Sequence, residues 1–135
     1  GRKPQKPKPS RQCWFAIAIT SSGEVLLQKR AATGIWGGLW APPEFSDEGS
    51  ATQWLQNTVG ISADHCDLGA PFHHVFTHFK LEATPVYAQC SENRPALPTV
   101  KVDDEELRWF SLHPVPSVGL PAPIVRLLKT LSNNA

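Results

Sequence analysis

The order of apolar and polar positions predicts that the folded part of the chain begins with two strands. Residues 13–20 are almost continuously apolar over the length of one strand, which is typical of a central strand covered on both faces. A serine-glycine turn follows, and residues 24–30 are predicted to return as a second strand. From Gly34 we expect a glycine-rich strand that enters a loop, and Pro42 and Pro43 should close it because proline cannot donate to a ladder.

Helical spacing first appears after this loop. Ser46 or Asp47 can cap a helix, and Gly60 is a natural stop. The apolar positions between these ends recur on one helix face, and they are Ala51, Trp54, Leu55 and Val59. The pattern therefore predicts one short amphipathic helix.

The second half of the chain returns to strand patterns. Strands are predicted near residues 68–75, at 81–90 and at 106–112. Pro85 should push its strand towards an edge or a bulge, because it lacks a backbone N–H. Residues 91–104 are polar and are expected to form a mobile loop.

A second helix is predicted near the C-terminal end. Pro121 and Pro123 suit a first helical turn. The apolar stripe that follows consists of Ile124, Leu127, Leu128 and Leu131. Strands interspersed with two helices indicate an α/β (α+β) fold, in which a mixed β-sheet is flanked by helices.

Size and composition narrow the class of protein. A chain of 135 residues is one ordinary domain with room for a core. No apolar run approaches membrane-spanning length and no secretion signal is visible, so no membrane partner and a cytoplasmic location are expected. The cysteines Cys13, Cys66 and Cys90 are widely spaced, whereas zinc and iron–sulfur sites need clustered ligands. We therefore expect no metal or cofactor in this chain.

Positive charge is concentrated at the N-terminal end. Residues 1–12 contain three prolines, no acidic residue and the basic residues Arg2, Lys3, Lys6, Lys8 and Arg11. The formal net charge of the chain is +1, so residues 13–135 carry −4, and such an acidic body is a poor free-standing nucleic-acid binder. We predict a basic, proline-rich interdomain linker at 1–12, either a solvated connector or an arm that follows phosphate, and a folded domain at 13–135.

The stretch that follows the glycines resembles the first half of the Nudix hydrolase box, a glycine followed after five residues by a glutamate. Gly38 and Glu44 fit this half. The family then carries a helix with the pattern Arg-Glu-apolar-x-Glu-Glu, whose carboxylates hold Mg²⁺ against a diphosphate. Here the helix reads Thr52-Gln53-Trp54-Leu55-Gln56-Asn57, in which Gln53, Gln56 and Asn57 are neutral and offer only amide oxygens. The resemblance implies a Nudix-like fold that has lost the hydrolytic chemistry.

Three stretches together look like the C-terminal domain of MutY-type adenine DNA glycosylases. They are residues 33–40, 74–78 and 116–120, in the order of that family. The whole enzymes remove adenine mispaired with 8-oxoguanine, using a catalytic N-terminal domain that holds an iron–sulfur cluster. The resemblance implies that this chain is the non-catalytic part that recognises 8-oxoguanine. The implied partners are that N-terminal domain and double-stranded DNA with an 8-oxoguanine:adenine mispair, in a bacterial cytoplasm at the nucleoid.

The same resemblance assigns lesion and DNA contacts to Phe76, Thr77 and His78. Oxidation at C8 turns guanine N7 from an acceptor into a donor, and a hydroxyl can accept from N7–H while it donates to O6. Thr77 has such a hydroxyl, although the family usually carries serine there. Phe76 is expected on an exposed loop, in or beside the base stack, and His78 should support the loop or contact the DNA backbone. The possible phosphate contacts are Arg2, Lys3, Lys6, Lys8 and Arg11.

Several alternatives remain open. The three histidines of 73–78 could suggest zinc, but no cysteine or carboxylate falls at a useful spacing. The acidic residues 103–106 could form a metal site, although such a run is typical of a solvated loop. Trp36 and Trp40 either line a former substrate cleft or pack in the core. The rival functions are an active Nudix nucleotide pyrophosphohydrolase that uses Glu44, and a protein-docking module that uses the 91–104 loop or the N-terminal tail.

Overall fold

The computed structural model describes residues 7–90, 95–97 and 105–134. Two helices are interspersed among the strands of this part of the chain, as the sequence pattern predicts. In chain order they are β1 (Ser10–Ile19), β2 (Glu24–Lys29), β3 (Trp40–Ala41), β4 (Glu44–Phe45), α1 (Glu48–Val59), the 3-10 turn η1 (Ala63–His65), β5 (Cys66–Leu68), β6 (Phe72–Val75), β7 (Lys80–Gln89), β8 (Leu107–Ser111) and α2 (Ala122–Asn133).

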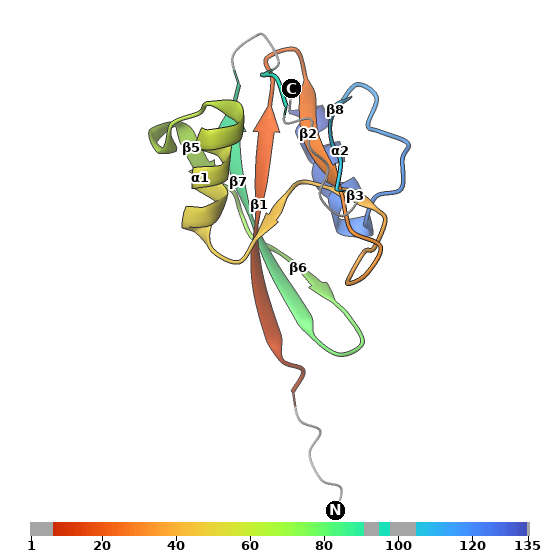
Figure 1. The fold of residues 1–135 in the computed structure, drawn as a ribbon. Helices are drawn as coiled ribbons and strands as arrows, with labels where there is room; N and C mark the ends of the chain where they lie inside the picture. Colours follow the sequence, from red (N-terminus) through yellow and green to blue (C-terminus); the bar gives the residue numbers. More distant parts are fainter. Residues whose placement is uncertain (1–6, 91–94, 98–104, 135) are drawn as a thin grey trace, which may run out of the picture.

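The strands form one mixed sheet, with β1 and β7 at its centre (Figure 1). β1 and β7 are parallel along their whole length, from Ser10 opposite Lys80 to Ile19 opposite Gln89. All other pairings are antiparallel: β2 pairs with β1, β3 and β8, β4 pairs with β1, and β5 and β6 both pair with β7. This arrangement confirms the predicted mixed sheet flanked by helices.

The two helices cover opposite faces of this sheet (Figure 1). Successive residues of a strand point to opposite faces. Phe15 of β1 accordingly lies in the core cluster that contains Leu128 of α2, whereas its neighbour Ala16 lies in the cluster that contains Leu55 of α1. Because residues 13–19 of β1 are covered on both faces, this part of its sequence is almost continuously apolar.

The ends of α1 lie where the sequence predicts them. The Asp47 carboxylate accepts a hydrogen bond of 2.7 Å from the Ser50 N–H, which caps the first turn. This bond and a second one from the Ser50 hydroxyl hold the pKa of Asp47 below its ordinary value. Gly60 ends the helix in the left-handed conformation, with φ 72°. Ala51, Leu55 and Val59 are buried.

The predicted start of the first strand is wrong by three residues. β1 begins at Ser10, so residues 10–12 of the predicted linker belong to the sheet. The reason is non-local, because Lys80–Glu82 offers these residues a parallel partner far along the chain.

Of the two positions predicted for Pro85, an edge or a bulge, the edge position is wrong. Its strand, β7, is central and pairs on both sides. The Pro85 carbonyl accepts from the Gly69 N–H at 2.9 Å, in the stretch between β5 and β6 where the antiparallel ladder is interrupted. The nitrogen that cannot donate faces this interruption, so no ladder hydrogen bond is lost.

Two further predictions differ from the structure. Residues 34–39 form a turn rather than a strand, and only Trp40 and Ala41 join the sheet before the two prolines. The segment predicted near 68–75 is divided into β5 and β6. Of the expected 91–104 loop only residues 95–97 are described, so the prediction of a mobile loop lies outside the described residues. None of the helices in the described ranges is long and apolar enough to cross a membrane.

Candidate nucleic-acid interface

The predicted lesion-contacting residues lie at the turn between β6 and β7. The Phe76 N–H donates to the Phe79 carbonyl at 2.8 Å, which closes a tight turn with Thr77 and His78 at its tip. The side chains of Thr77 and His78 are exposed. Figure 1 shows that this hairpin projects from the body of the domain together with the start of β1. The tip of this turn is thus accessible to solvent.

Phe76 differs from the expectation of an exposed side chain. It is half-buried, because its ring packs on other rings of this chain. Its ring centroid lies 4.6 Å from that of Phe79 in a stacked arrangement, and 4.6 Å from that of His74 in an edge-on arrangement. A third ring, Trp36, lies 5.3 Å away. These contacts make Phe76 a support of the turn from within the domain.

The described part of the basic N-terminal segment lies against this turn. The Lys8 Nζ donates to the Phe76 carbonyl at 2.9 Å, and the Lys80 N–H donates to the Pro9 carbonyl at 2.9 Å. The Arg11 guanidinium lies 5.7 Å from the centroid of the Phe79 ring. Two of the predicted phosphate contacts are therefore beside the predicted lesion contacts. The other three, Arg2, Lys3 and Lys6, lie outside the described residues.

The glycine-rich turn at 34–38 presses a tryptophan against this hairpin. Trp36 has φ 54°, a left-handed conformation that is rare for a bulky residue. Its ring contacts the rings of His74 and Phe76 at centroid distances of 5.7 Å and 5.3 Å. The sequence left the place of Trp36 open between cleft and core. Its position between Gly34 and Gly37 was the only local signal of a special turn.

Gly37 and Gly38, at the centre of this turn, are required for two different structural reasons. A Cβ at Gly37 would lie 2.2 Å from the Ala32 carbonyl oxygen, so this glycine permits a close approach of two backbone segments. Gly38 instead has φ +76° with open space around it. Its N–H donates to the Arg30 and Ala31 carbonyls at 3.1 Å and 3.2 Å. Together they give the turn its shape.

Glu44, the glutamate of the Nudix-like half motif, is held by arginines. Its carboxylate is 3.2 Å from the Arg30 Nη1 and 3.7 Å from the Arg11 Nη2, and its side chain is only 16% exposed. A polar cavity of about 200 Å³ adjoins it, lined by Gln28, Arg30, Ala31, Thr33, Glu44 and Glu105. Two guanidinium groups thus lie against the carboxylate, which favours a charge-paired role over metal ligation.

The structure shows no clustered donor set for a metal ion among the residues it describes. The His73 Nε2 lies 3.2 Å from a Glu82 carboxylate oxygen, whereas His74 packs on rings. Of the acidic run at 103–106, residues 103 and 104 lie outside the described ranges. Cys13 and Cys90 are buried and separate. Burial, and then the charge of Glu44, raises the pKa of the Cys13 thiol to about 12, so this thiol stays neutral.

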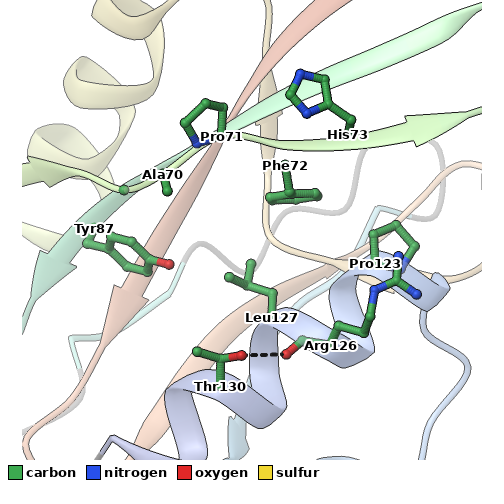
Figure 2. A pocket seen from close by; sticks show the side chains of 10 residues that line it. Ala70, Pro71, Phe72, His73, Tyr87, Pro123, Arg126, Leu127 and Thr130 are labelled. Carbon is green, nitrogen blue, oxygen red and sulfur yellow. Dashed lines mark hydrogen bonds between the residues drawn. The ribbon is translucent and has the colours of Figure 1, made fainter.

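A larger, mostly apolar groove lies elsewhere, between α2 and the segment that joins β5 to β6. Its volume is about 430 Å³, and Figure 2 shows Tyr87, Phe72 and Leu127 converging on it, with Arg126 beside Pro123 at one end. None of the predicted site residues lines this groove. The groove is therefore separate from both the hairpin turn and the Glu44 cavity.

Comparison with known proteins shows a match to a protein family over most of this chain. The NUDIX domain family matches residues 14–130. The adenine DNA glycosylase of Buchnera aphidicola subsp. Acyrthosiphon pisum (strain APS) is 26% identical over 130 residues, which is 96% of this chain and 35% of that protein. The chain thus spans about a third of the length of this relative.

Solved structures resemble the fold. The C-terminal domain of mouse MUTYH, in a crystal structure of its complex with human PCNA, has a TM-score of 0.68 and 18% identity, and the match covers 91% of this chain and 87% of that one. The NUDIX domain of Shewanella oneidensis NrtR, solved with ADP ribose, has a TM-score of 0.69 and 17% identity, covering 98% and 93%. At such identities the likeness concerns the fold alone.

Proposed function

The chain belongs to the NUDIX domain family, and from this premise we propose that it is the lesion-recognition domain of an A/G-specific adenine DNA glycosylase. In this proposal it recognises 8-oxoguanine opposite adenine in double-stranded DNA and does not itself catalyse a reaction. Catalysis would lie in an N-terminal domain of the same protein, which would hold the iron–sulfur cluster. The enzyme would work in base excision repair, at the nucleoid in a bacterial cytoplasm.

The observation that carries the proposal is the exposed Thr77 hydroxyl at the tip of the β6–β7 turn, beside a basic arm. A hydroxyl is able to accept from the N7–H of 8-oxoguanine and to donate to O6, whereas guanine has no hydrogen on N7. Lys8 and Arg11 would face phosphates on the same side. The bulk of the domain is acidic, so it would act as one arm of a larger DNA clamp.

The charge pairing around Glu44 supports the absence of hydrolysis in this proposal. A Nudix hydrolase needs several carboxylates to hold Mg²⁺ against a diphosphate. Here Glu44 is paired with Arg30 and Arg11, and Gln53, Gln56 and Asn57 on α1 are neutral and exposed.

The proposal is tested in the full-length enzyme with Thr77→Ala, and with Thr77→Ser as the matched control that keeps the hydroxyl. We expect Thr77→Ala to reduce the preference for 8-oxoguanine:adenine over guanine:adenine duplexes about fivefold to 150-fold, the value of roughly 1–3 kcal/mol for one discriminating contact. Thr77→Ser should retain the preference. Equal losses on both duplexes would contradict the role of Thr77.

The rival hydrolase function has its own assay. The chain is incubated with Mg²⁺ and 8-oxo-dGTP, and pyrophosphate release is followed. Steady release that is abolished by Glu44→Gln would favour a nucleotide pyrophosphohydrolase. We expect no release above the background of a sample without the protein.

A protein-docking role is the second candidate, and the mouse neighbour solved with human PCNA favours it. A pull-down of a repair or replication partner that survives Thr77→Ala but fails after deletion of residues 91–104, or of the N-terminal tail, would support docking. A pull-down that fails with Thr77→Ala alone would instead connect the partner to the β6–β7 turn.

A further inference from the structure

We infer that Trp36, held by the Arg30–Glu44 pair, is a positioning residue that sets the β6–β7 turn and so tunes its selectivity for 8-oxoguanine. This inference rests on the proposed function and extends it to residues that do not touch the lesion. It assigns a new role to the Glu44 region, which would support the turn through Arg30 and Trp36.

The first step is the contact between the turn and the tryptophan. The Trp36 ring packs on the ring of Phe76, the residue before Thr77, with 5.3 Å between the ring centroids. It also packs on the His74 ring, with 5.7 Å between the centroids. Phe76 in turn stacks on Phe79 at 4.6 Å, and the same two residues close the turn by their backbone hydrogen bond. The turn thus rests on one connected set of rings, with Trp36 as the member that comes from a different part of the chain.

Contacts with Arg30 hold Trp36 in place. Its left-handed backbone, with φ 54°, is strained, and such strain persists only where the surrounding contacts impose it. Arg30 supplies these contacts: its Nε donates to the Ile35 carbonyl at 3.1 Å, its backbone carbonyl accepts from the Gly38 N–H at 3.1 Å, and its guanidinium carbon lies 5.8 Å from the centroid of the Trp36 ring. Arg30 therefore fixes the turn on both sides of the tryptophan.

The Glu44 carboxylate orients the Arg30 guanidinium. Its Nη1 lies 3.2 Å from a Glu44 oxygen, and both side chains are mostly buried, at 20% and 16% exposed. A partly buried charge-assisted hydrogen bond orients a guanidinium more firmly than a solvent-exposed one. A path of direct contacts thus runs from Glu44 through Arg30 and Trp36 to Phe76.

The arm on the other side of the turn completes the arrangement. Lys8 donates to the Phe76 carbonyl, and Arg11 contacts both the Phe79 ring and Glu44. The turn is therefore held between the ring set and the basic arm. A change at Trp36 should alter the orientation of Thr77, whereas Lys8 and Arg11 keep their charges.

The test compares Trp36→Ala with Trp54→Ala in the full-length enzyme. Trp54 is a half-buried tryptophan of α1 that packs on Phe45 and so controls for the loss of a tryptophan as such. We expect Trp36→Ala to lower the preference for 8-oxoguanine:adenine over guanine:adenine duplexes about twofold to thirtyfold, the range of coupling through packed contacts. Trp36→Phe should restore part of it, and Trp54→Ala should leave the preference unchanged.

A second measurement separates this inference from the proposed function. Backbone amide chemical shifts of residues 76–79 are recorded for the chain itself, as the parent, Trp36→Ala, Arg30→Lys and Trp54→Ala proteins. We expect large shifts in the Trp36 and Arg30 variants, and small shifts in the Trp54 variant. Unchanged shifts in the first two variants overturn the inference.

The outcomes of the two tests are distinguishable. If Thr77→Ala abolishes the preference and Trp36→Ala does not change it, the inference fails while the proposed function stands. If the parent enzyme shows no preference for 8-oxoguanine, the proposed function fails and takes the selectivity role of Trp36 with it.

Discussion

Replacing Gly37 by alanine should destabilise the domain more than the same replacement at Gly34, three residues earlier. A Cβ at position 37 would lie 2.2 Å from the Ala32 carbonyl oxygen and 2.8 Å from its carbonyl carbon, and both are backbone atoms that cannot rotate away. Gly34 has φ +92° and no heavy atom within 4 Å of its added Cβ. The two substitutions therefore separate a steric effect from a conformational one.

The expected magnitudes follow from these two mechanisms. The left-handed conformation costs an L-residue about 1–2 kcal/mol, so Gly34→Ala should lose about this much. Gly37→Ala forces the backbone to move, and overpacking of this kind costs about 1–3 kcal/mol. The displaced turn would also weaken the hydrogen bonds that Gly38 makes to Arg30 and Ala31, adding about 0.5–1.5 kcal/mol for each bond that is lost. With both bonds lost, we expect a total of about 2–6 kcal/mol for Gly37→Ala.

The assay is urea unfolding followed by tryptophan fluorescence and, independently, by far-ultraviolet circular dichroism. A lower midpoint with an unchanged slope reports a change in stability. A free energy of unfolding for Gly37→Ala within about 0.5 kcal/mol of the parent protein, the range of ordinary surface substitutions, would refute the steric clash. A larger loss of stability in Gly34→Ala than in Gly37→Ala would refute it as well.

Three further predictions concern single side chains. Asp47→Ala should lower the thermal midpoint at neutral pH, because it removes the helix cap. The pKa of Asp47 is depressed in the folded state, so the difference in midpoint from the parent protein should shrink as the pH falls below the ordinary pKa of 3.8. Melting curves over an acidic pH series will measure this difference. Cys13, with a pKa of about 12, should resist a thiol reagent in the folded protein at mildly alkaline pH, and mass spectrometry should find Cys66 modified first. Gly69→Ala should destabilise the domain because its Cβ would lie 2.4 Å from the Tyr87 ring, and Tyr87→Ala in the same chain should relieve part of the loss in a double-mutant cycle.

The features that the sequence predicted depend on neighbouring residues. Asp47 and Gly60 mark the ends of α1 because helix caps are local interactions. The apolar run of residues 13–19 in β1 indicated burial on both faces, because this pattern lies within one short stretch of sequence. The loop at Thr77, which the family resemblance implied, does lie between two strands, whereas its role in lesion recognition stays a prediction.

The features that the sequence could not predict depend on pairings between distant segments. The first residues of β1 become strand only because Lys80–Glu82 lies beside them. The place of Pro85 in a central strand depends on where the pairings of β5 and β6 with β7 end. The partial burial of Phe76 depends on Trp36, which comes from another turn. Glu44 was visible as part of a motif, but its arginine partners are contributed by β1 and by the residue that follows β2.

The parallel pairing of β1 with β7 also has a consequence for how the chain reaches its native state. Ser10–Ile19 is synthesised before the other strands of this sheet, and its partner Lys80–Gln89 is made only after β2 to β6. Contacts of such high sequence separation form slowly, because a long loop must close first. Until then a strand of nearly unbroken apolar sequence is exposed to other molecules. Chains cut short before residue 89 should therefore aggregate, while longer nascent chains can sequester this strand.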